Sequence, residues 1–170
     1  MIAHPFAARK AARSRRTSQV TVAAILASLA GKAGFYSCGS HGQTALAETL
    51  EAAGIGYRHA VELGGRLSGE PGEERFPCIR VAAFRSYAAR MGTDEWQKAL
   101  AVALAEPAPC FMCAETLWTR CHRRLIAELL VARGHELTHL LAPGRSDTHR
   151  LYDESEVRDG RLYLCGSLVA

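Results

Sequence analysis

The chain has 170 residues, of which 48% are hydrophobic and 22% are charged, and its formal net charge is +4. This length fits one domain, and this composition excludes an intrinsically disordered chain. No apolar run reaches the roughly 18 residues that a membrane span needs, so we expect no membrane partner. Six cysteines are too few for a disulfide-rich scaffold, so we expect reduced thiols and a cytoplasmic location.

The positive charge is concentrated at the start of the chain. Residues 1–47 contain six basic residues and no Asp or Glu, whereas the remainder is slightly acidic. Residues 1–19 show no hydrophobic period, and we predict that they form a basic, disordered arm. Such an arm could bind nucleic acid, target the chain to a compartment, or be a solvated tail. Because the rest of the chain is slightly acidic, nucleic acid is possible as a partner but not favoured.

Regular hydrophobic patterns begin at Thr44. Residues 44–54 have helical spacing, with Thr44 as a candidate N-cap and Gly54 as the C-terminal stop. Residues 55–63 are predicted as a strand. The Gly and Pro residues in 67–80 then predict a long loop.

Two further helices are predicted before the centre of the chain. The first is short and covers residues 84–88. The second covers residues 94–105, with Thr93 as its N-cap. Near the end of the chain, Pro143-Gly144 breaks the pattern, and Asp159-Gly160 predicts a hairpin turn.

The centre of the chain, residues 108–134, predicts a strand, a tight loop and a helix. The apolar run 110–114 is the strand, and apolar residues on one face indicate an amphipathic helix that ends at Gly134: Leu125, Ile126, Leu129 and Leu130. A second apolar run, 135–141, predicts the next strand. Together these elements predict a βαβ unit, and in open α/β sheets ligands bind at the turn where the first strand ends.

Five reactive side chains surround that turn. Cys113 and Glu115 follow the strand, and Cys121, His122 and Arg123 stand at the start of the helix. A helix N-terminus carries partial positive charge, which lowers the pKa of a nearby thiol and attracts anions.

This pattern, Cys113-Ala-Glu115 followed by Cys121-His122-Arg123, resembles the signature of the family known as domain of unknown function 488 (DUF488). The resemblance implies a single three-layer α/β domain with a mostly parallel sheet, here over residues 44–170. The family's opening Gly-His-Ser and Asp-Val-Arg strands do not appear, so the sheet could be incomplete at its N-terminal strands. We interpret residues 20–43 as a divergent segment. For residues 1–43 as a whole, three interpretations stay open: genuine sequence, a divergent segment, or an artefact of a shifted reading frame or start site.

We consider four residues as catalytic candidates. Cys121 or Cys113 is the candidate nucleophile, and Glu115 or His122 is the candidate proton carrier. The competing interpretations are buried packing for the cysteines and for His122, and ion pairing for Glu115. For Cys110 and Cys165, which lie in apolar runs, we predict packing alone.

The candidate anion-binding residues are Arg123, Arg66, Arg85 and Tyr87. Guanidinium groups match phosphate and carboxylate geometry, so we expect a small anionic substrate that is phosphorylated or nucleotide-like.

A metal site is the less favoured alternative. Cys110, Cys113, Cys121 and His122 formally supply four zinc ligands. However, Cys110 and Cys113 should lie on opposite faces of a strand, and Cys121 and His122 should diverge on a helix. We therefore expect no cofactor, with zinc at Cys113, Cys121 and His122 as the alternative.

The sequence thus predicts an enzyme, with a hydrolase or a transferase that uses a cysteine nucleophile as the expected type. The alternative is a non-catalytic module that binds nucleic acid or nucleotides. The reaction, the substrate and the oligomeric state are not indicated by the sequence.

Overall fold

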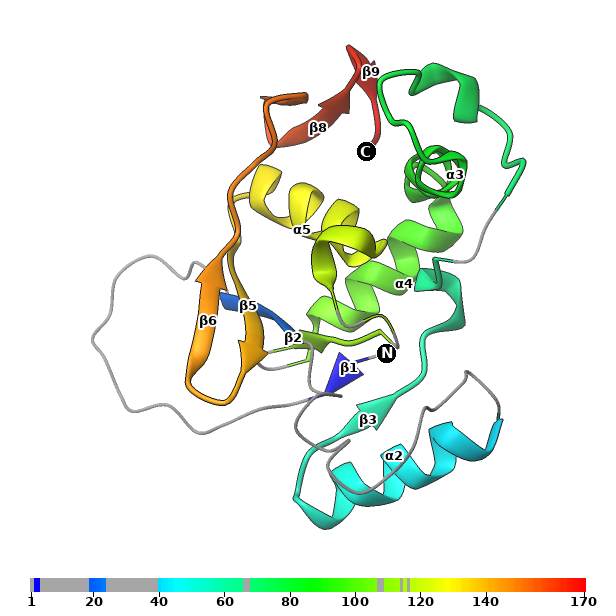
Figure 1. The fold of residues 1–170 in the computed structure, drawn as a ribbon. Helices are drawn as coiled ribbons and strands as arrows, with labels where there is room; N and C mark the ends of the chain where they lie inside the picture. The colour runs from blue at the N-terminus through cyan, green and yellow to red at the C-terminus, as the bar shows by residue number, and fades with distance from the viewer. Residues whose placement is uncertain are drawn as a thin grey trace.

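A computed structural model describes residues 2–3, 19–23, 40–65, 68–106, 109–113, 115 and 117–170, which are coloured in Figure 1. Two short pieces of the N-terminal region, Ile2–Ala3 (β1) and Gln19–Ala23 (β2), are strands. The rest of the predicted basic arm, 1–19, and most of the predicted divergent segment, 20–43, lie outside the described residues. The proposed domain over 44–170 falls largely within them.

Six strands form the main sheet in the order β3-β1-β4-β2-β5-β6. The strands not yet given are β3 (Tyr57–Arg58), β4 (Cys110–Phe111), β5 (Glu136–Ala142) and β6 (Arg145–Thr148). Strand β2 lies between β4 and β5 and runs parallel to both. Strands β4 and β5, which precede and follow α5 (Arg123–Ala132) in the chain, are therefore parallel to each other, and β2 lies between them in the sheet.

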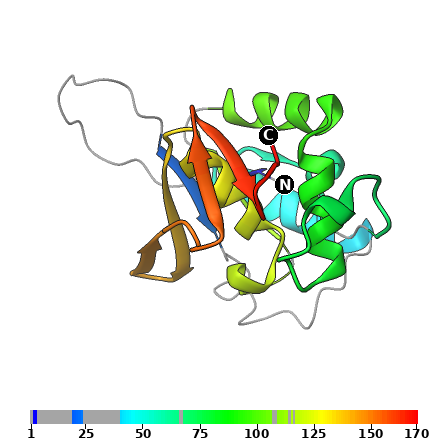
Figure 2. The same ribbon diagram turned by 90° about the horizontal axis from the view of Figure 1, so that it is seen from above.

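A second, three-stranded sheet forms from the C-terminal residues, in the order β7-β8-β9. Its strands are β7 (Ser155–Arg158), β8 (Arg161–Leu164) and β9 (Ser167–Leu168). Figure 1 shows this sheet above α5, and Figure 2 shows it between the β5–β6 pair and α3 (Ala82–Met91). The buried Leu162 of β8 joins the core that α5 forms.

The expected fold class, a three-layer domain with a mostly parallel sheet, is wrong. Of the seven strand pairings among the described residues, five are antiparallel: β1 with β3 and with β4, β5 with β6, β7 with β8, and β8 with β9. The prediction extended the parallel pairing expected of one βαβ unit to the whole sheet. Instead, β6 forms an antiparallel hairpin with β5, the N-terminal β1 pairs antiparallel with both β3 and β4, and the C-terminal strands form a separate sheet.

Residues of β4 reach helices on both faces of the main sheet. Phe111 belongs to the large cluster around α5, whereas Cys110 and Met112 pack with Leu50 of α2 (Ser40–Ala52). This alternation follows from the opposite directions of neighbouring side chains in a strand. It confirms the prediction that Cys110 is a packing residue.

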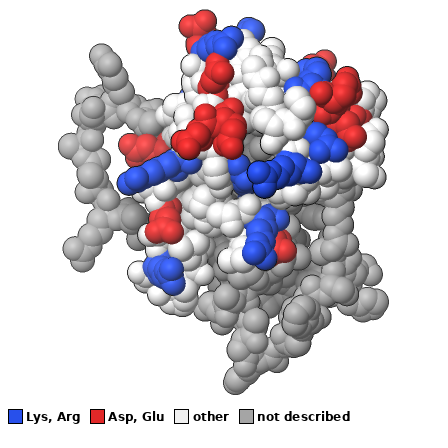
Figure 3. All heavy atoms as spheres, turned by 45° about the horizontal axis from the view of Figure 1, so that its top comes forward, with Lys and Arg blue, Asp and Glu red and all other residues white. Residues whose placement is uncertain are grey.

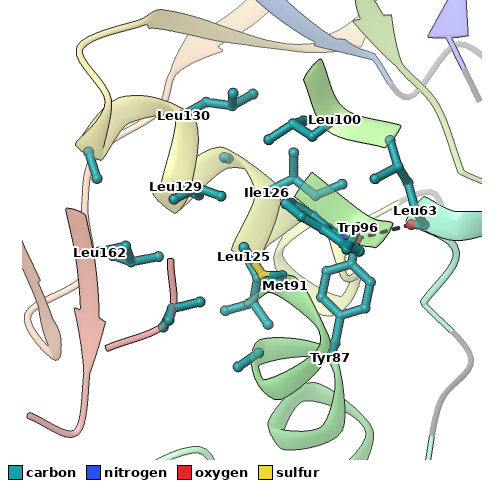
Figure 4. Packing of buried hydrophobic residues seen from close by; sticks show 14 of the residues in the cluster. Leu63, Tyr87, Met91, Trp96, Leu100, Leu125, Ile126, Leu129, Leu130 and Leu162 are labelled. Carbon is teal, nitrogen blue, oxygen red and sulfur yellow. Dashed lines mark hydrogen bonds between the residues drawn. The ribbon is translucent and has the colours of Figure 1, made fainter. Parts of the chain in front are cut away.

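Helix α5 is the centre of the core. Its predicted apolar face is buried, and so are Ala127, Glu128 and Ala132. Figure 4 shows α3 and α4 (Asp94–Leu104) packed against this helix, through Tyr87, Met91, Trp96 and Leu100. The Thr93 cap is confirmed, because its hydroxyl accepts a hydrogen bond from the Trp96 backbone N–H at 3.3 Å.

Element boundaries differ from the predictions in the first half of the chain. Helix α2 begins at Ser40 rather than at Thr44, although Gly54 ends it as expected, with a φ of 70°. The predicted strand 55–63 is only β3 followed by a 3-10 turn, η1 (Val61–Leu63). The chain turns here because Leu63 is buried and its carbonyl accepts a hydrogen bond from Tyr87.

The predicted hairpin at Asp159-Gly160 is confirmed. Both residues have positive φ, 51° and 73°, and they join the antiparallel strands β7 and β8. This is the backbone geometry that favours Asp-Gly in two-residue turns.

Cys165 and Cys78 form a disulfide, so the expectation of reduced thiols throughout is wrong. Cys165 packs against the core as predicted, but packing is not its sole role. Cys165 and Gly166 both have positive φ and make a tight turn between β8 and β9. That turn presents Cys165 to the loop before α3, 87 residues earlier in the chain.

Among the helices in the described part of the chain, none combines the length and the apolar character that crossing a bilayer requires.

The disulfide closes a long loop, which in the chain-entropy account contributes roughly 4–5 kcal/mol by restricting the unfolded chain. Replacing Cys78 and Cys165 together by Ser should lower the unfolding free energy by about that amount, measured by urea denaturation. Peptide mapping of wild-type protein, alkylated without reductant, should recover the two cysteines in one linked peptide. Recovery of both as alkylated thiols would contradict the assignment.

Candidate functional site

The predicted reactive residues meet where the loop after β4 enters α5. Cys121 follows a 3-10 turn, η3 (Trp118–Arg120), and has an extended backbone, with φ −123° and ψ 152°. His122 then takes helical angles as the first residue beside α5. Because Cys121 is extended and not helical, the two neighbouring side chains converge, and the predicted divergence is wrong. The Nδ1 atom of His122 lies 3.4 Å from Cys121 Sγ and 4.0 Å from Cys113 Sγ.

Arg123 closes the site from inside the protein. Its residue is only 1% exposed, and its Nε donates to Cys121 Sγ at 3.3 Å. Its terminal NH2 group donates to the backbone carbonyl of Glu115. A buried guanidinium is costly unless negative or strongly polar partners surround it, and a thiolate is such a partner.

The two thiols have very different acidities. The pKa of Cys121 is lowered to about 6, first by a hydrogen bond from Cys113 and then, against the opposing effect of burial, by the charge and hydrogen bonds of Arg123. The pKa of Cys113 is raised to about 11, first by its hydrogen bond to Cys121 and then by burial. The two shifts favour the thiolate at Cys121 and the protonated thiol at Cys113 near neutral pH.

The absence of a side chain at Gly65 allows the His122 ring to lie against the backbone at this position. A Cβ atom on Gly65 would lie 2.2 Å from His122 Nδ1, so only a residue without a side chain allows this approach. On the other side, the ring of Tyr87 lies 5.1 Å from the His122 ring. The Tyr87 hydroxyl donates to the Leu63 carbonyl at 3.0 Å and accepts from Trp96 Nε1 at 3.2 Å, and Figure 4 shows these three residues together.

The remaining predicted site residues are placed differently. The side chain of Glu115 is exposed and accepts from the Leu117 backbone N–H at 3.2 Å within its own loop. Arg85 donates to the carbonyls of Ile79 and Arg80. Tyr87 is fully buried, and Arg66 lies outside the described residues. Of the four predicted anion-binding residues, the structure thus brings Arg123 into contact with a cysteine and Tyr87 into contact with His122.

Cys113, Cys121 and His122 could also hold one metal ion. Their ligand atoms all lie within 4.8 Å of one another, and thiolate sulfur and imidazole nitrogen are zinc ligands. Cys110 is not part of this group in the described structure, because it packs against α2.

A second group of buried polar residues was missed by the sequence reasoning. His139 Nε2 lies 2.8 Å from His149 Nδ1, and His149 Nε2 lies 3.2 Å from Glu128 Oε1. All three residues are at most 5% exposed. The available signal was a charged residue within the apolar face of α5 and a histidine within the apolar run of β5.

A surface cavity of about 710 Å³ lies beside this second group. Trp118 and Tyr152 are its aromatic lining residues, and the others come from β6 and the segment after it: Ser146, Asp147, Thr148, Arg150, Leu151, Asp153 and Glu154. Its ionisable lining residues are mostly acidic, and the thiol site is not among them.

Comparison with known proteins assigns a family but no activity. The family model "Domain of unknown function DUF488" matches residues 39–130, which is more than half of the chain. The chain therefore belongs to this family, as the cysteine motif indicated. No curated protein and no solved structure matches it.

Replacing Gly65 by Ala should displace His122, because the added Cβ would overlap its ring. Overpacking of this kind typically costs about 1–3 kcal/mol of unfolding free energy, which urea denaturation would measure. Gly56→Ala is the matched control, because nothing lies within 4 Å of the Cβ position at that exposed glycine. Equal stability of the two variants would contradict the placement of His122.

Proposed function

We propose that this member of the DUF488 family is an enzyme in which the Cys121 thiolate attacks an electrophilic substrate. The observation that supports this proposal most strongly is the contact of Cys121 Sγ with the buried Arg123 guanidinium at 3.3 Å. A thiolate is the reactive form of cysteine, and a lowered pKa makes it available near neutral pH. In this proposal Cys121 takes up a group from the substrate. The reaction is a hydrolysis if water then accepts this group, and a group transfer if another molecule accepts it.

Cys113 and His122 have complementary roles in this proposal. Cys113 remains protonated near neutral pH, so it can donate a proton to a leaving group or return one to Cys121. His122 Nδ1 lies within reach of both sulfur atoms and can carry the proton between them. Glu115 contributes its backbone carbonyl, which orients Arg123, and its exposed carboxylate is the remaining candidate for proton transfer with solvent.

We propose a small anionic substrate, phosphorylated or nucleotide-like. Arg123 and the N-terminus of α5 make the surroundings of Cys121 positive, and the exposed Arg120 precedes Cys121 directly. A cytoplasmic location belongs to this proposal because the reaction requires Cys113 and Cys121 as free thiols, although the Cys78–Cys165 disulfide is uncommon in that compartment.

The alternative, a non-catalytic module that binds nucleic acid or nucleotides, has less support. Basic and acidic side chains intermingle on the face shown in Figure 3. Electrostatic binding to nucleic acid favours a basic patch or stripe that follows the phosphates. The aromatic lining of the cavity at Trp118 could stack on a base, but its mostly acidic ionisable groups disfavour phosphate.

The pH dependence of iodoacetamide labelling, mapped by cysteine on reduced and chelator-treated protein, tests the proposed nucleophile. Cys121 should titrate at about 6 and Cys113 at about 11. Replacing Cys113 by Ala should raise the Cys121 midpoint, because it removes the hydrogen bond that lowers that pKa most. Cys110→Ala should leave the Cys121 midpoint unchanged, because Cys110 lies in the separate cluster with Leu50.

Three further results of the same experiment are decisive. The ratio of labelling by negatively charged iodoacetate to labelling by neutral iodoacetamide is compared between Cys121 in the folded protein and the same cysteine in the urea-unfolded chain. A higher ratio in the folded protein supports the anionic substrate class, and an equal ratio contradicts it. An ordinary Cys121 midpoint near 8.5 contradicts the nucleophile. If protein not treated with chelator contains about one equivalent of zinc, the proposal of a metal-free nucleophile is contradicted, and a metal centre at Cys113, Cys121 and His122 takes its place.

A further inference from the structure

The buried residues Glu128, His149 and His139 form a continuous hydrogen-bonded chain across three elements. Glu128 comes from the middle of α5, His149 follows β6, and His139 lies in β5. The backbone N–H of His149 also donates to the Leu137 carbonyl at 2.9 Å, which fixes this residue to the strand. We call these three residues the buried relay.

The direction of the hydrogen bonds in the buried relay follows from Glu128. Its Oε2 accepts from the Ser155 hydroxyl at 2.6 Å and from the Tyr152 backbone N–H at 3.4 Å. With the carboxylate as the acceptor, His149 donates from Nε2 and accepts at Nδ1 from His139 Nε2. The rings of His139 and His149 are therefore each held in one tautomer and one orientation.

His139 is neutral in this arrangement. Its pKa is lowered to about 3, first by burial and then by the repulsion that a protonated His149 and Arg123 would exert on a protonated His139. Arg124 is the other cation nearby, and its guanidinium is 3.4 Å from the centre of the Tyr152 ring. A neutral imidazole can lie near these cations without repelling them.

Trp118 stacks on the ring that the buried relay holds. Its centroid is 3.7 Å from that of His139, with an angle of 7° between the rings, and it meets the His149 ring edge-on at 5.4 Å. The other described residues between Cys113 and Cys121 are exposed: Glu115, Leu117, Thr119 and Arg120. Trp118 is therefore the side chain that attaches this loop to the protein interior.

The same tryptophan is bonded to the proposed nucleophile through the backbone. The Cys121 N–H donates to the Trp118 carbonyl at 3.2 Å, which closes η3 and leaves Cys121 extended. A displacement of Trp118 would act on Cys121 through this bond. The Cys121 carbonyl is also held by the Arg124 N–H of α5 at 3.0 Å, and Arg123 binds the same loop at the Glu115 carbonyl. The position of Trp118 is therefore one of the restraints on the 3.3 Å contact between Cys121 Sγ and Arg123 Nε, and it acts through the Cys121 N–H.

We propose that Glu128, His149 and His139 are positioning residues that hold Trp118 and thereby keep Cys121 in contact with Arg123. This inference rests on the proposed function of Cys121. It gives the buried relay a role in the reactivity of the thiol site that packing alone would not have.

The test is the pH profile of iodoacetamide labelling at Cys121 in four variants of the full chain. Trp118→Leu removes the planar stack, and Glu128→Gln changes the hydrogen bonds of the buried relay while keeping its shape. Both should raise the labelling midpoint by at least about one pH unit above the wild-type value of about 6, so that labelling at pH 6 becomes about fivefold slower. Trp118→Phe, which keeps an aromatic ring, should retain a midpoint close to wild type.

Leu129→Ala is the control for general destabilisation, because Leu129 is fully buried on α5 beside Glu128 but belongs to the apolar core. It should lower the melting temperature and raise the labelling rate at high pH without moving the midpoint. If Glu128→Gln and Trp118→Leu behave like this control, the buried relay is only structural and the inference fails. If Trp118→Leu does not fold, the midpoint of Glu128→Gln decides alone: a raised midpoint supports the inference, and an unmoved one overturns it. An ordinary midpoint in the wild-type protein would instead overturn the proposed nucleophile.

Discussion

The guanidinium of Arg123 is buried, and this single charge constrains the rest of the site. Removing an ion from water costs several kcal/mol even after the protein relaxes, so the group requires partners that repay desolvation. Arg123 is 1% exposed and donates to Cys121 Sγ and to the Glu115 carbonyl. A deprotonated Cys121 supplies the countercharge. The buried cation and the thiolate therefore stabilise one another, and the low pKa of Cys121 is part of what makes the fold tolerate Arg123.

Helix α5 carries a second buried polar side chain, Glu128. A chain of contacts connects Glu128 to the loop that carries Cys121. Glu128 is satisfied by His149, Ser155 and the Tyr152 N–H, all from the chain that follows β6. His149 in turn orients His139, on which Trp118 stacks. The C-terminal residues thus do more than cover the core, because they fix the loop that delivers Cys121 to Arg123.

The sequence predicted the local features whose cause is local. The Thr93 cap, the Asp159-Gly160 turn and the end of α5 just before Gly134 depend on neighbouring residues. The Cys-Glu, Cys-His-Arg spacing identified the family. Contacts between distant segments were not predictable in this way. The Cys78–Cys165 bond spans 87 residues, and the His139–His149 contact depends on a hairpin that the sequence showed only as a break at Pro143-Gly144. The convergence of Cys121 and His122 was missed because it requires an extended Cys121 immediately before the helix.

The most direct measurement of the central claim is a pH titration of thiolate ultraviolet absorbance, taken as the difference between wild-type protein and Cys121→Ser. It observes the ionisation itself, without a reagent that must reach the sulfur. If Cys121 is the thiolate paired with Arg123, the difference should rise with a midpoint at about pH 6. A difference that appears only near pH 8.5, the usual range of a free thiol, would contradict the account.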